Sequence, residues 1–155
     1  MKKQKGFSLI ELLIVVAIIL IIAAIAIPNL MKSKMAANES SAVGSVRTVN
    51  TGEVTYAASC PGIGFSATLV ELNTGAVCAG GTGIIDNVLS TGVKSGYTFT
   101  YTPVATNGLN TTYTTVAVPQ TVGTTGQRGF YSDQTGVIRY TLDGTAPTNA
   151  ASALQ

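Results

Sequence analysis

The sequence predicts an α+β fold in which one long amino-terminal helix packs on a small antiparallel sheet. Sixteen apolar residues follow one another without interruption from Leu12 to Ile27. Beyond them, apolar residues recur at spacings of three, four and seven as far as Ala57, which is typical of an amphipathic helix. From Tyr97 the pattern changes to an alternation of period two, which is typical of strands with one buried face.

A short basic leader opens the chain, with three lysines among its first six residues. The apolar run that follows, extended back to Phe7, reaches the length of about 20 residues that is needed to span a bilayer. Because the lysines precede the span and none lies within it, the amino terminus is expected on the cytoplasmic side and the remaining residues outside.

Two ordinary interpretations compete for this segment. A cleaved secretory signal would have a short apolar stretch and a small-residue site such as Ala24-Ile25-Ala26, and an uncleaved anchor would need only the length. Neither accounts for Glu11, because a carboxylate at the bilayer centre costs about 2.5–3.5 kcal/mol. Glu11 is therefore expected to have a partner.

The segment from Lys5 to Val16, Lys-Gly-Phe-Ser-Leu-Ile-Glu-Leu-Leu-Ile-Val-Val, resembles the class III signal of type IV pilins and type II secretion pseudopilins. The resemblance implies that a membrane prepilin peptidase cuts between Gly6 and Phe7 and methylates the new amine of Phe7. It places Glu11 at the acidic position of the family and Pro28 where many members carry a helix-bending proline. The close match ends near Pro28, and beyond it the resemblance is one of architecture.

The chemistry of Glu11 supports a role in assembly. In a filament, a buried carboxylate beside the buried amine of a neighbouring copy's Phe7 would neutralise both charges, and burying one charge alone is far costlier than burying the pair. Such a pair fixes the axial register between copies. The alternative is that Glu11 reaches the lipid headgroups and contacts nothing specific.

The expected organisation is a leader over residues 1–6, a helix over residues 7–57 and a head over residues 58–155. Within the helix, residues 7–27 form the membrane or filament-core segment. Pro28 removes a backbone donor and is expected to bend the helix there.

In the second half of the helix, the expected contacts with the head are Val43, Val46 and Val54. Glu39 and Glu53 are expected among the polar positions of the same helix.

The head is expected to hold four short strands in an antiparallel meander, since short connections favour that pairing. The expected strands are Tyr97–Thr102, Thr111–Val118, Gly129–Ser132 and Val137–Leu142. Short helical turns or edge pieces are expected at 67–73 and 84–90, and the tail from Gly144 is expected to be loose.

The chain has two cysteines, Cys60 and Cys78. A location outside the cytoplasm permits a disulfide between them, which on the loop-entropy model contributes roughly 3 kcal/mol. Two buried free thiols are the alternative. A metal site needs more ligands than two cysteines, and the chain has no histidine.

Composition excludes several classes of function. Without histidine there is no Ser-His-Asp or Cys-His set, so no catalytic residue and no cofactor are expected. Asp86, Asp133 and Asp143 stand beside turn-forming residues, and the last two make a poor calcium cage. Loss of the leader removes three of nine basic residues, and the remaining six face seven acidic ones. Such a balance gives no nucleic-acid footprint.

These features predict a structural subunit of a type IV pilus filament, used in adhesion, twitching motility or DNA uptake. By resemblance, its partners are copies of itself, the prepilin peptidase, and an inner-membrane assembly platform with its ATPase. The expected location is the inner membrane for the precursor and the cell surface for the filament. A pseudopilin of a type II secretion system, with a periplasmic filament, is the alternative within the family. A monomeric membrane-anchored binding module is the alternative from another class.

Overall fold

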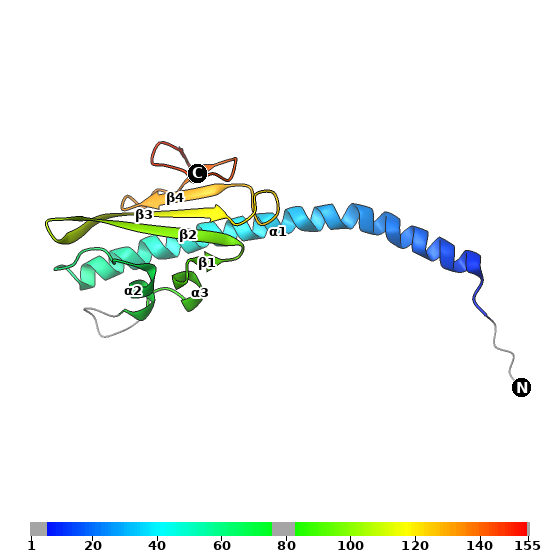
Figure 1. The fold of residues 1–155 in the computed structure, drawn as a ribbon, viewed down its shortest axis with the longest axis horizontal. Helices are drawn as coiled ribbons and strands as arrows, with labels where there is room; N and C mark the ends of the chain where they lie inside the picture. Colours follow the sequence, from blue (N-terminus) through cyan, green and yellow to red (C-terminus); the bar gives the residue numbers. More distant parts are fainter. Residues whose placement is uncertain (1–5, 76–82, 155) are drawn as a thin grey trace, which may run out of the picture. The chain divides into compact units, whose positions relative to one another are not determined.

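Figure 1 shows the computed structural model of the chain, which describes residues 6–75 and 83–154. The chain divides into two compact units, Met1–Lys34 and Met35–Gln155. Helix α1, Leu9–Ser59, supplies the apolar rod of the first unit. The rest of α1, two short helices and a six-stranded antiparallel sheet make up the second unit. The predicted α+β fold, a long helix on an antiparallel sheet, is confirmed.

The ends of α1 lie close to the expected ones. The helix begins at Leu9 rather than Phe7 and ends at Ser59 rather than near Ala57. The N–H of Cys60 still donates to the carbonyl of Tyr56 at 2.9 Å, but Pro61 follows, and the residue before a proline is disfavoured in the helical region. The helix passes through Pro28 without interruption, and a bend at that position stays a prediction.

One face of the second half of α1 forms the centre of the core of the head. Its buried members recur every three or four residues, and Ala42, Val46 and Val49 are completely inaccessible to solvent. They pack with Phe99 and Phe130 from the inner face of the sheet, among others. The predicted amphipathic helix is therefore present, with its apolar stripe against the head.

The expected contact of Val54 with the head is wrong, since this side chain is 64% exposed. Val46 is fully buried as expected, and Val43 is partly buried against the core. Seven residues return a helix almost to the same face, whereas eight rotate it by a further ~100°. Position 53, not position 54, therefore continues the stripe that contains Val46.

Truncation of these two valines is expected to separate their roles. Val46→Ala removes the equivalent of two buried methylene groups and is expected to lower the free energy of unfolding of the head by about 1.5 kcal/mol. Val54→Ala is expected to change it by less than about 0.5 kcal/mol, as for other exposed sites. Urea unfolding of both full-length variants in detergent solution measures the difference. Equal losses from the two variants would contradict the assigned helix face.

The sheet is an antiparallel meander in which each strand pairs with the next along the chain. Its four longer strands correspond to the four predicted ones, and a two-residue strand is added at each edge. In order, the strands are β1 Val93–Lys94, β2 Tyr97–Thr106, β3 Leu109–Pro119, β4 Gly129–Asp133, β5 Arg139–Thr141 and β6 Ser152–Ala153.

The β2–β3 hairpin is longer than expected because its turn was not recognised. Asn107 and Gly108 both have positive φ, at 53° and 83°, and Thr106 pairs with Leu109 across them. Asn-Gly is the sequence favoured in two-residue turns of type I′, which match the twist of the flanking strands. Ser95 and Gly96, with φ of 51° and 73°, form the corresponding turn between β1 and β2.

The expectation of a loose tail beyond Gly144 is wrong for its last part. Strand β6 pairs with β5, and the N–H of Leu154 donates to the carbonyl of Ile138 at 2.7 Å. Arg139 Nη1 donates to the carbonyl of Ala151 at 3.0 Å. Backbone pairing and this one long side chain therefore hold a segment whose composition predicts no regular structure.

Short helices occur where helical turns were expected. Helix α2, Leu69–Thr74, is capped by the Thr68 side chain, which accepts from the N–H of Glu71. Helix α3, Asn87–Ser90, is capped by Asp86, which accepts from the N–H of Leu89. Both caps follow the ordinary preference for hydroxyl and carboxylate side chains at a helix start.

Candidate assembly site at the amino terminus

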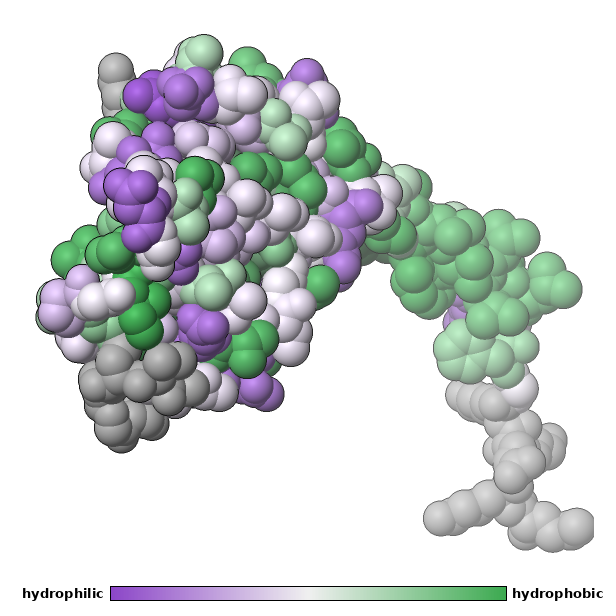
Figure 2. All heavy atoms as spheres, turned by 60° about the vertical axis from the view of Figure 1, so that its left-hand side comes forward, coloured by the Kyte–Doolittle hydropathy of each residue, from purple (hydrophilic) through white to green (hydrophobic). Residues whose placement is uncertain are grey.

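The amino-terminal segment of α1 exposes apolar side chains on every side. Phe7 and Leu9 are each 81% exposed, and the large apolar residues from Leu12 to Ile27 are exposed as well. Figure 2 shows this rod as an almost unbroken hydrophobic surface. Among the described residues, α1 is the one helix that is long and apolar enough to cross a membrane. Water cannot be the environment in which this surface remains, because its exposure is too costly.

Glu11 caps the amino-terminal end of α1. The backbone N–H of Ser8 donates to Glu11 Oε2 at 2.8 Å, and the N–H of Leu12 donates to the carbonyl of Ser8 at 3.2 Å. Ser8-Leu9-Ile10-Glu11 has the Ser-x-x-Glu spacing of a capping box, in which the acid reaches back to the residue that begins the helix. The Ser-x-x-Glu spacing is visible in the sequence, but Glu11 was expected to contact other copies and the cap was not predicted.

The cap gives Glu11 a partner within its own chain. The carboxylate stands at the helix end where backbone N–H groups are unpaired and the helix dipole favours negative charge. One of its oxygens, Oε2, accepts the Ser8 N–H, and Glu11 as a whole remains exposed. The same carboxylate can therefore stabilise the helix start and still receive a hydrogen bond from another molecule.

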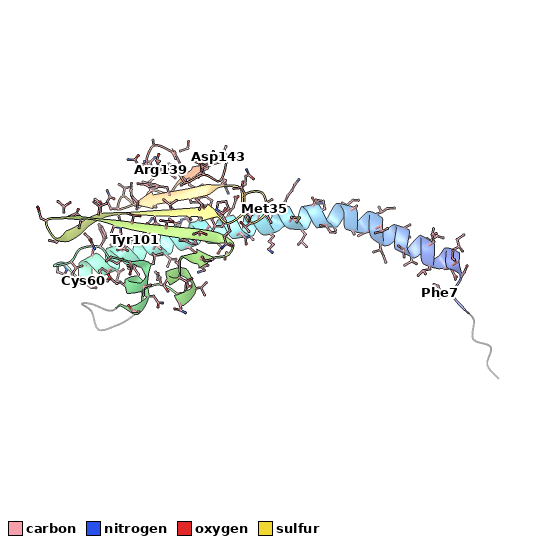
Figure 3. All side chains as sticks on the ribbon, in the orientation of Figure 1. Phe7, Met35, Cys60, Tyr101, Arg139 and Asp143 are labelled. Atoms are coloured by element: carbon pink, nitrogen blue, oxygen red, sulfur yellow. The ribbon has the colours of Figure 1, made fainter. Side chains whose placement is uncertain are left out.

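The remaining predicted site residues fall in different places. Gly6 and Phe7 precede α1 and are exposed, as a processing site requires. Cys60 is buried at the carboxyl end of α1 (Figure 3). Cys78 lies outside the described residues, so its pairing with Cys60 stays a prediction.

The three aspartates considered as acids or ligands have local roles. Asp86 caps α3 and pairs with Lys94 Nζ at 2.7 Å. Asp133 accepts from the N–H of Thr135 at 2.9 Å. Asp143, labelled in Figure 3, accepts from the N–H of Thr145 at 3.1 Å. In the part of the chain that the structure describes, no three His, Cys, Asp or Glu residues gather as a metal site would require.

Glu39 was expected at a polar position of α1, but it is buried against the head. Its Oε1 accepts from the N–H groups of Gln127 at 2.8 Å and Arg128 at 3.1 Å. Its Oε2 accepts from Arg128 Nε at 2.7 Å. Burial acts to raise the pKa of Glu39, but the hydrogen bonds from Gln127 and Arg128 outweigh it, and the pKa lies below its ordinary value of 4.5.

Glu53 was also expected at a polar position and is completely buried. Its two oxygens accept from the N–H and the hydroxyl of Ser66, at 2.9 Å and 2.6 Å. Tyr101, on β2 in Figure 3, donates its hydroxyl to the carbonyl of Ser66 at 3.0 Å. Burial raises the pKa of Glu53, and the Ser66 hydrogen bonds oppose that rise only in part.

These two acids hold the second half of α1 in register with the head. Glu39 and Glu53 lie fourteen positions apart on the stripe that contains Val46 and Tyr56. Their position on that stripe was the signal available in the sequence. A buried carboxylate needs hydrogen-bond donors, and the fold decides which residues supply them. The helix pattern therefore did not identify Ser66, Gln127 and Arg128 as the partners.

Comparison with known proteins agrees with the amino-terminal motif. The family model for the prokaryotic N-terminal methylation motif matches residues 1–27. The chain is 59% identical over 39 residues to the type IV wide pilus major component PilA4 of Thermus thermophilus, a match that covers 25% of this chain and 30% of that protein. It is 44% identical over 54 residues to the type IV major pilin protein PilA of Myxococcus xanthus, covering 35% and 24%.

These matches span less than a third of either relative's length. No solved structure matches the chain significantly. The likeness therefore concerns a limited part of the chain, and the methylation motif within it includes the exposed apolar start of α1. The amino-terminal part of this chain is therefore similar to that of type IV pilins and carries the prokaryotic N-terminal methylation motif.

Proposed function

We propose that this chain is the structural subunit of a type IV pilus filament. The observation that carries the proposal is the exposed apolar rod, which lies within the match to the N-terminal methylation motif over residues 1–27. In the precursor, lipid would cover the rod, and after assembly the rods of other copies would cover it. Both environments remove the apolar side chains from water, which is the main favourable contribution to such packing.

Processing would prepare the rod for this transfer. Cleavage after Gly6 removes the basic leader and frees the amine of Phe7, which the same peptidase would methylate. Without its three leader lysines, the segment loses the charges that hold the amino terminus at the cytoplasmic surface. The assembly platform and its ATPase would then lift the subunit out of the inner membrane into the growing filament at the cell surface.

Glu11 would set the position of each incoming subunit. Its carboxylate stands at the exposed start of α1, and the amine of Phe7 in a neighbouring copy would be the complementary charge. A single such pair per subunit favours one axial register, because every other register leaves two unpaired charges among apolar side chains. The pair would therefore contribute specificity for one axial register more than net stability.

The similarity to a type IV wide pilus major component and to a type IV major pilin favours a pilus over the shorter pseudopilus. A structural role makes no demand for a cofactor, and we propose none.

Mass spectrometry of the protein recovered from its native host tests the proposal. The expected mature chain begins at Phe7 with a methylated amine. Electron microscopy of material sheared from the cell surface should then show filaments that contain it. A chain that retains Met1 and is never found in a polymer would instead support an anchored binding module, and a filament confined to the periplasm would support a pseudopilin.

A further inference from the structure

The tip of the β2–β3 hairpin extends beyond the strands that support the rest of the sheet. Strand β1 pairs with β2 only as far as Thr98, and β4 pairs with β3 only as far as Thr114. Past these points the hairpin is two-stranded, except that Asn110 pairs with the segment beside Gly64 through backbone hydrogen bonds with Ile63 at 2.9 Å and Phe65 at 3.0 Å. Two-stranded hairpins are marginally stable in water, so the tip is expected to open locally more often than the rest of the sheet.

Asn107 and Gly108 form this tip, and both are exposed. Among the described residues, the carboxamide of Asn107 makes no hydrogen bond, and the N–H of Gly108 donates to no backbone carbonyl. A Cβ placed on Gly108 would meet nothing within 4 Å. The amide nitrogen of Gly108 is therefore unhindered, and the neighbouring carboxamide is free to rotate toward it.

We propose that Asn107–Gly108 is a site of spontaneous deamidation. The deprotonated amide nitrogen of Gly108 attacks Cγ of Asn107, a new carbon–nitrogen bond forms, and the side-chain nitrogen leaves as ammonia with the proton. The product is a five-membered cyclic imide. Water then adds to one of the two imide carbonyls and opens the ring to aspartate or isoaspartate, without oxidation or reduction.

The fold supplies matched sites at which this reaction is hindered. Asn50, Asn73 and Asn110 each precede a threonine. In each of them Nδ2 donates a hydrogen bond, to Ser132 Oγ, to the carbonyl of Ile85 and to the carbonyl of Phe65 respectively. A held carboxamide cannot turn toward the next backbone nitrogen, and a side chain on the next residue obstructs the approach.

The chain contains one further acidic or amide residue before a glycine in a left-handed conformation, Asp143–Gly144. There the Asp143 carboxylate is occupied by Thr145, and a Cβ on Gly144 would come within 2.6 Å of Val122. Asp143–Gly144 is therefore hydrogen-bonded and closely packed, whereas Asn107–Gly108 is not. This difference favours the hairpin tip as the site of the reaction.

The reaction would change the outer surface of the head. Each event adds one negative charge to a mature chain whose side-chain charges nearly balance. The isoaspartate product also inserts an extra backbone carbon into a two-residue turn and is expected to loosen the pairing of Thr106 with Leu109.

Peptide mapping of the full-length chain tests the proposal. The protein is incubated in detergent micelles at mildly alkaline pH, and the conversion of each asparagine is followed over time by mass spectrometry with fragmentation that separates aspartate from isoaspartate. Asn107 is expected to convert faster than Asn50, Asn73 and Asn110 by an order of magnitude or more. Conversion of Asn107 no faster than these three would overturn the proposal.

Gly108→Ala is the matched variant, because a methyl group beside the attacking nitrogen hinders ring closure. The expected result is a slower conversion of Asn107 with the three reference asparagines unchanged. Conversion of Asn107 at the wild-type rate in this variant would show that the Gly108 amide is not the nucleophile.

Discussion

Replacing Glu11 with alanine is expected to leave insertion into the membrane intact and to abolish incorporation into filaments. The apolar run that inserts is unchanged by the substitution. In the filament, however, each subunit would bury the amine of Phe7 without its partner, and an uncompensated buried charge costs about 3–5 kcal/mol. Immunoblots of the membrane fraction and of sheared filaments measure the two outcomes separately. Wild-type filament yield from the variant would refute the role.

The capping hydrogen bond from Ser8 makes a second variant necessary. Glu11→Gln keeps an oxygen that can accept the Ser8 N–H but carries no charge. If the charge pair sets the register, this variant fails to assemble as Glu11→Ala does. Assembly by Glu11→Gln but not by Glu11→Ala would show that the helix cap is what filament formation requires, and the proposed pairing with Phe7 would be wrong.

Replacing Glu39 with alanine is expected to lower the free energy of unfolding of the head by about 2 kcal/mol, since charged hydrogen bonds to a buried carboxylate are lost while the Arg128 side chain, 37% exposed, keeps access to water. The change leaves the N–H groups of Gln127 and Arg128 without their acceptor. It also leaves the guanidinium of Arg128, which lies 5.6 Å from the ring centroid of Phe130, without its anion. Urea unfolding of the full-length chain in detergent solution, followed by near-ultraviolet circular dichroism, measures the loss.

Glu39→Gln is the matched control, because an amide oxygen still accepts hydrogen bonds while the charge is absent. A smaller loss than that of Glu39→Ala is expected, since neutral hydrogen bonds contribute about 1 kcal/mol each and charged ones more. Unfolding free energies equal to wild type in both variants would show that the contacts of Glu39 with the head contribute nothing.

The contribution of Glu39 should also depend on pH. The pKa of this carboxyl is lower in the folded chain than its ordinary 4.5, so ionisation favours the folded state. Its stabilising contribution is complete above that ordinary value and is lost as the pH falls through the folded pKa. The stability difference between wild type and Glu39→Gln is therefore expected to be full at neutral pH and to shrink in acid. A difference that does not change with pH would contradict the charged hydrogen bonds.

The contribution of Glu53 to stability depends on pH in the opposite direction to that of Glu39. Burial raises the pKa of Glu53, so the folded state favours its neutral form, and the associated stability is lost as the pH rises through the folded pKa. Comparing each variant with wild type, rather than following wild type alone, separates the effect of Glu39 from that of Glu53.

Local patterns were sufficient for the helices and strands and for the amino-terminal methylation motif. The apolar run, the period of the following helix and the alternation in β2 and β3 identified the long helix and the meander, because these patterns depend on neighbours in sequence. The Ser8–Glu11 cap and the Asn107–Gly108 turn were also readable from the sequence. Neither was predicted, although Ser-x-x-Glu and Asn-Gly are both local signals, for a helix start and for a two-residue turn.

The hydrogen-bond partners of the buried polar groups could not be predicted from local sequence patterns. Glu39 and Glu53 look like ordinary polar positions of an exposed helix face, and Val54 looks like a core residue. Which of them is buried depends on how the helix is rotated against the sheet. That rotation depends on contacts with other segments, through Ser66, 13 positions from Glu53, and through Gln127 and Arg128, 88 and 89 positions from Glu39.

The order of residues by itself determined that this chain carries an amino-terminal methylation motif, an apolar helical segment and a small sheet. Each of those features is an effect of spacing and composition within one stretch of chain. Only the tertiary structure decided that two acids in the second half of α1 are buried against the head and that the last strand pairs at the edge of the sheet. Burial of a charge is tolerated where donors from distant segments converge on it, and that convergence exists only once the chain has folded.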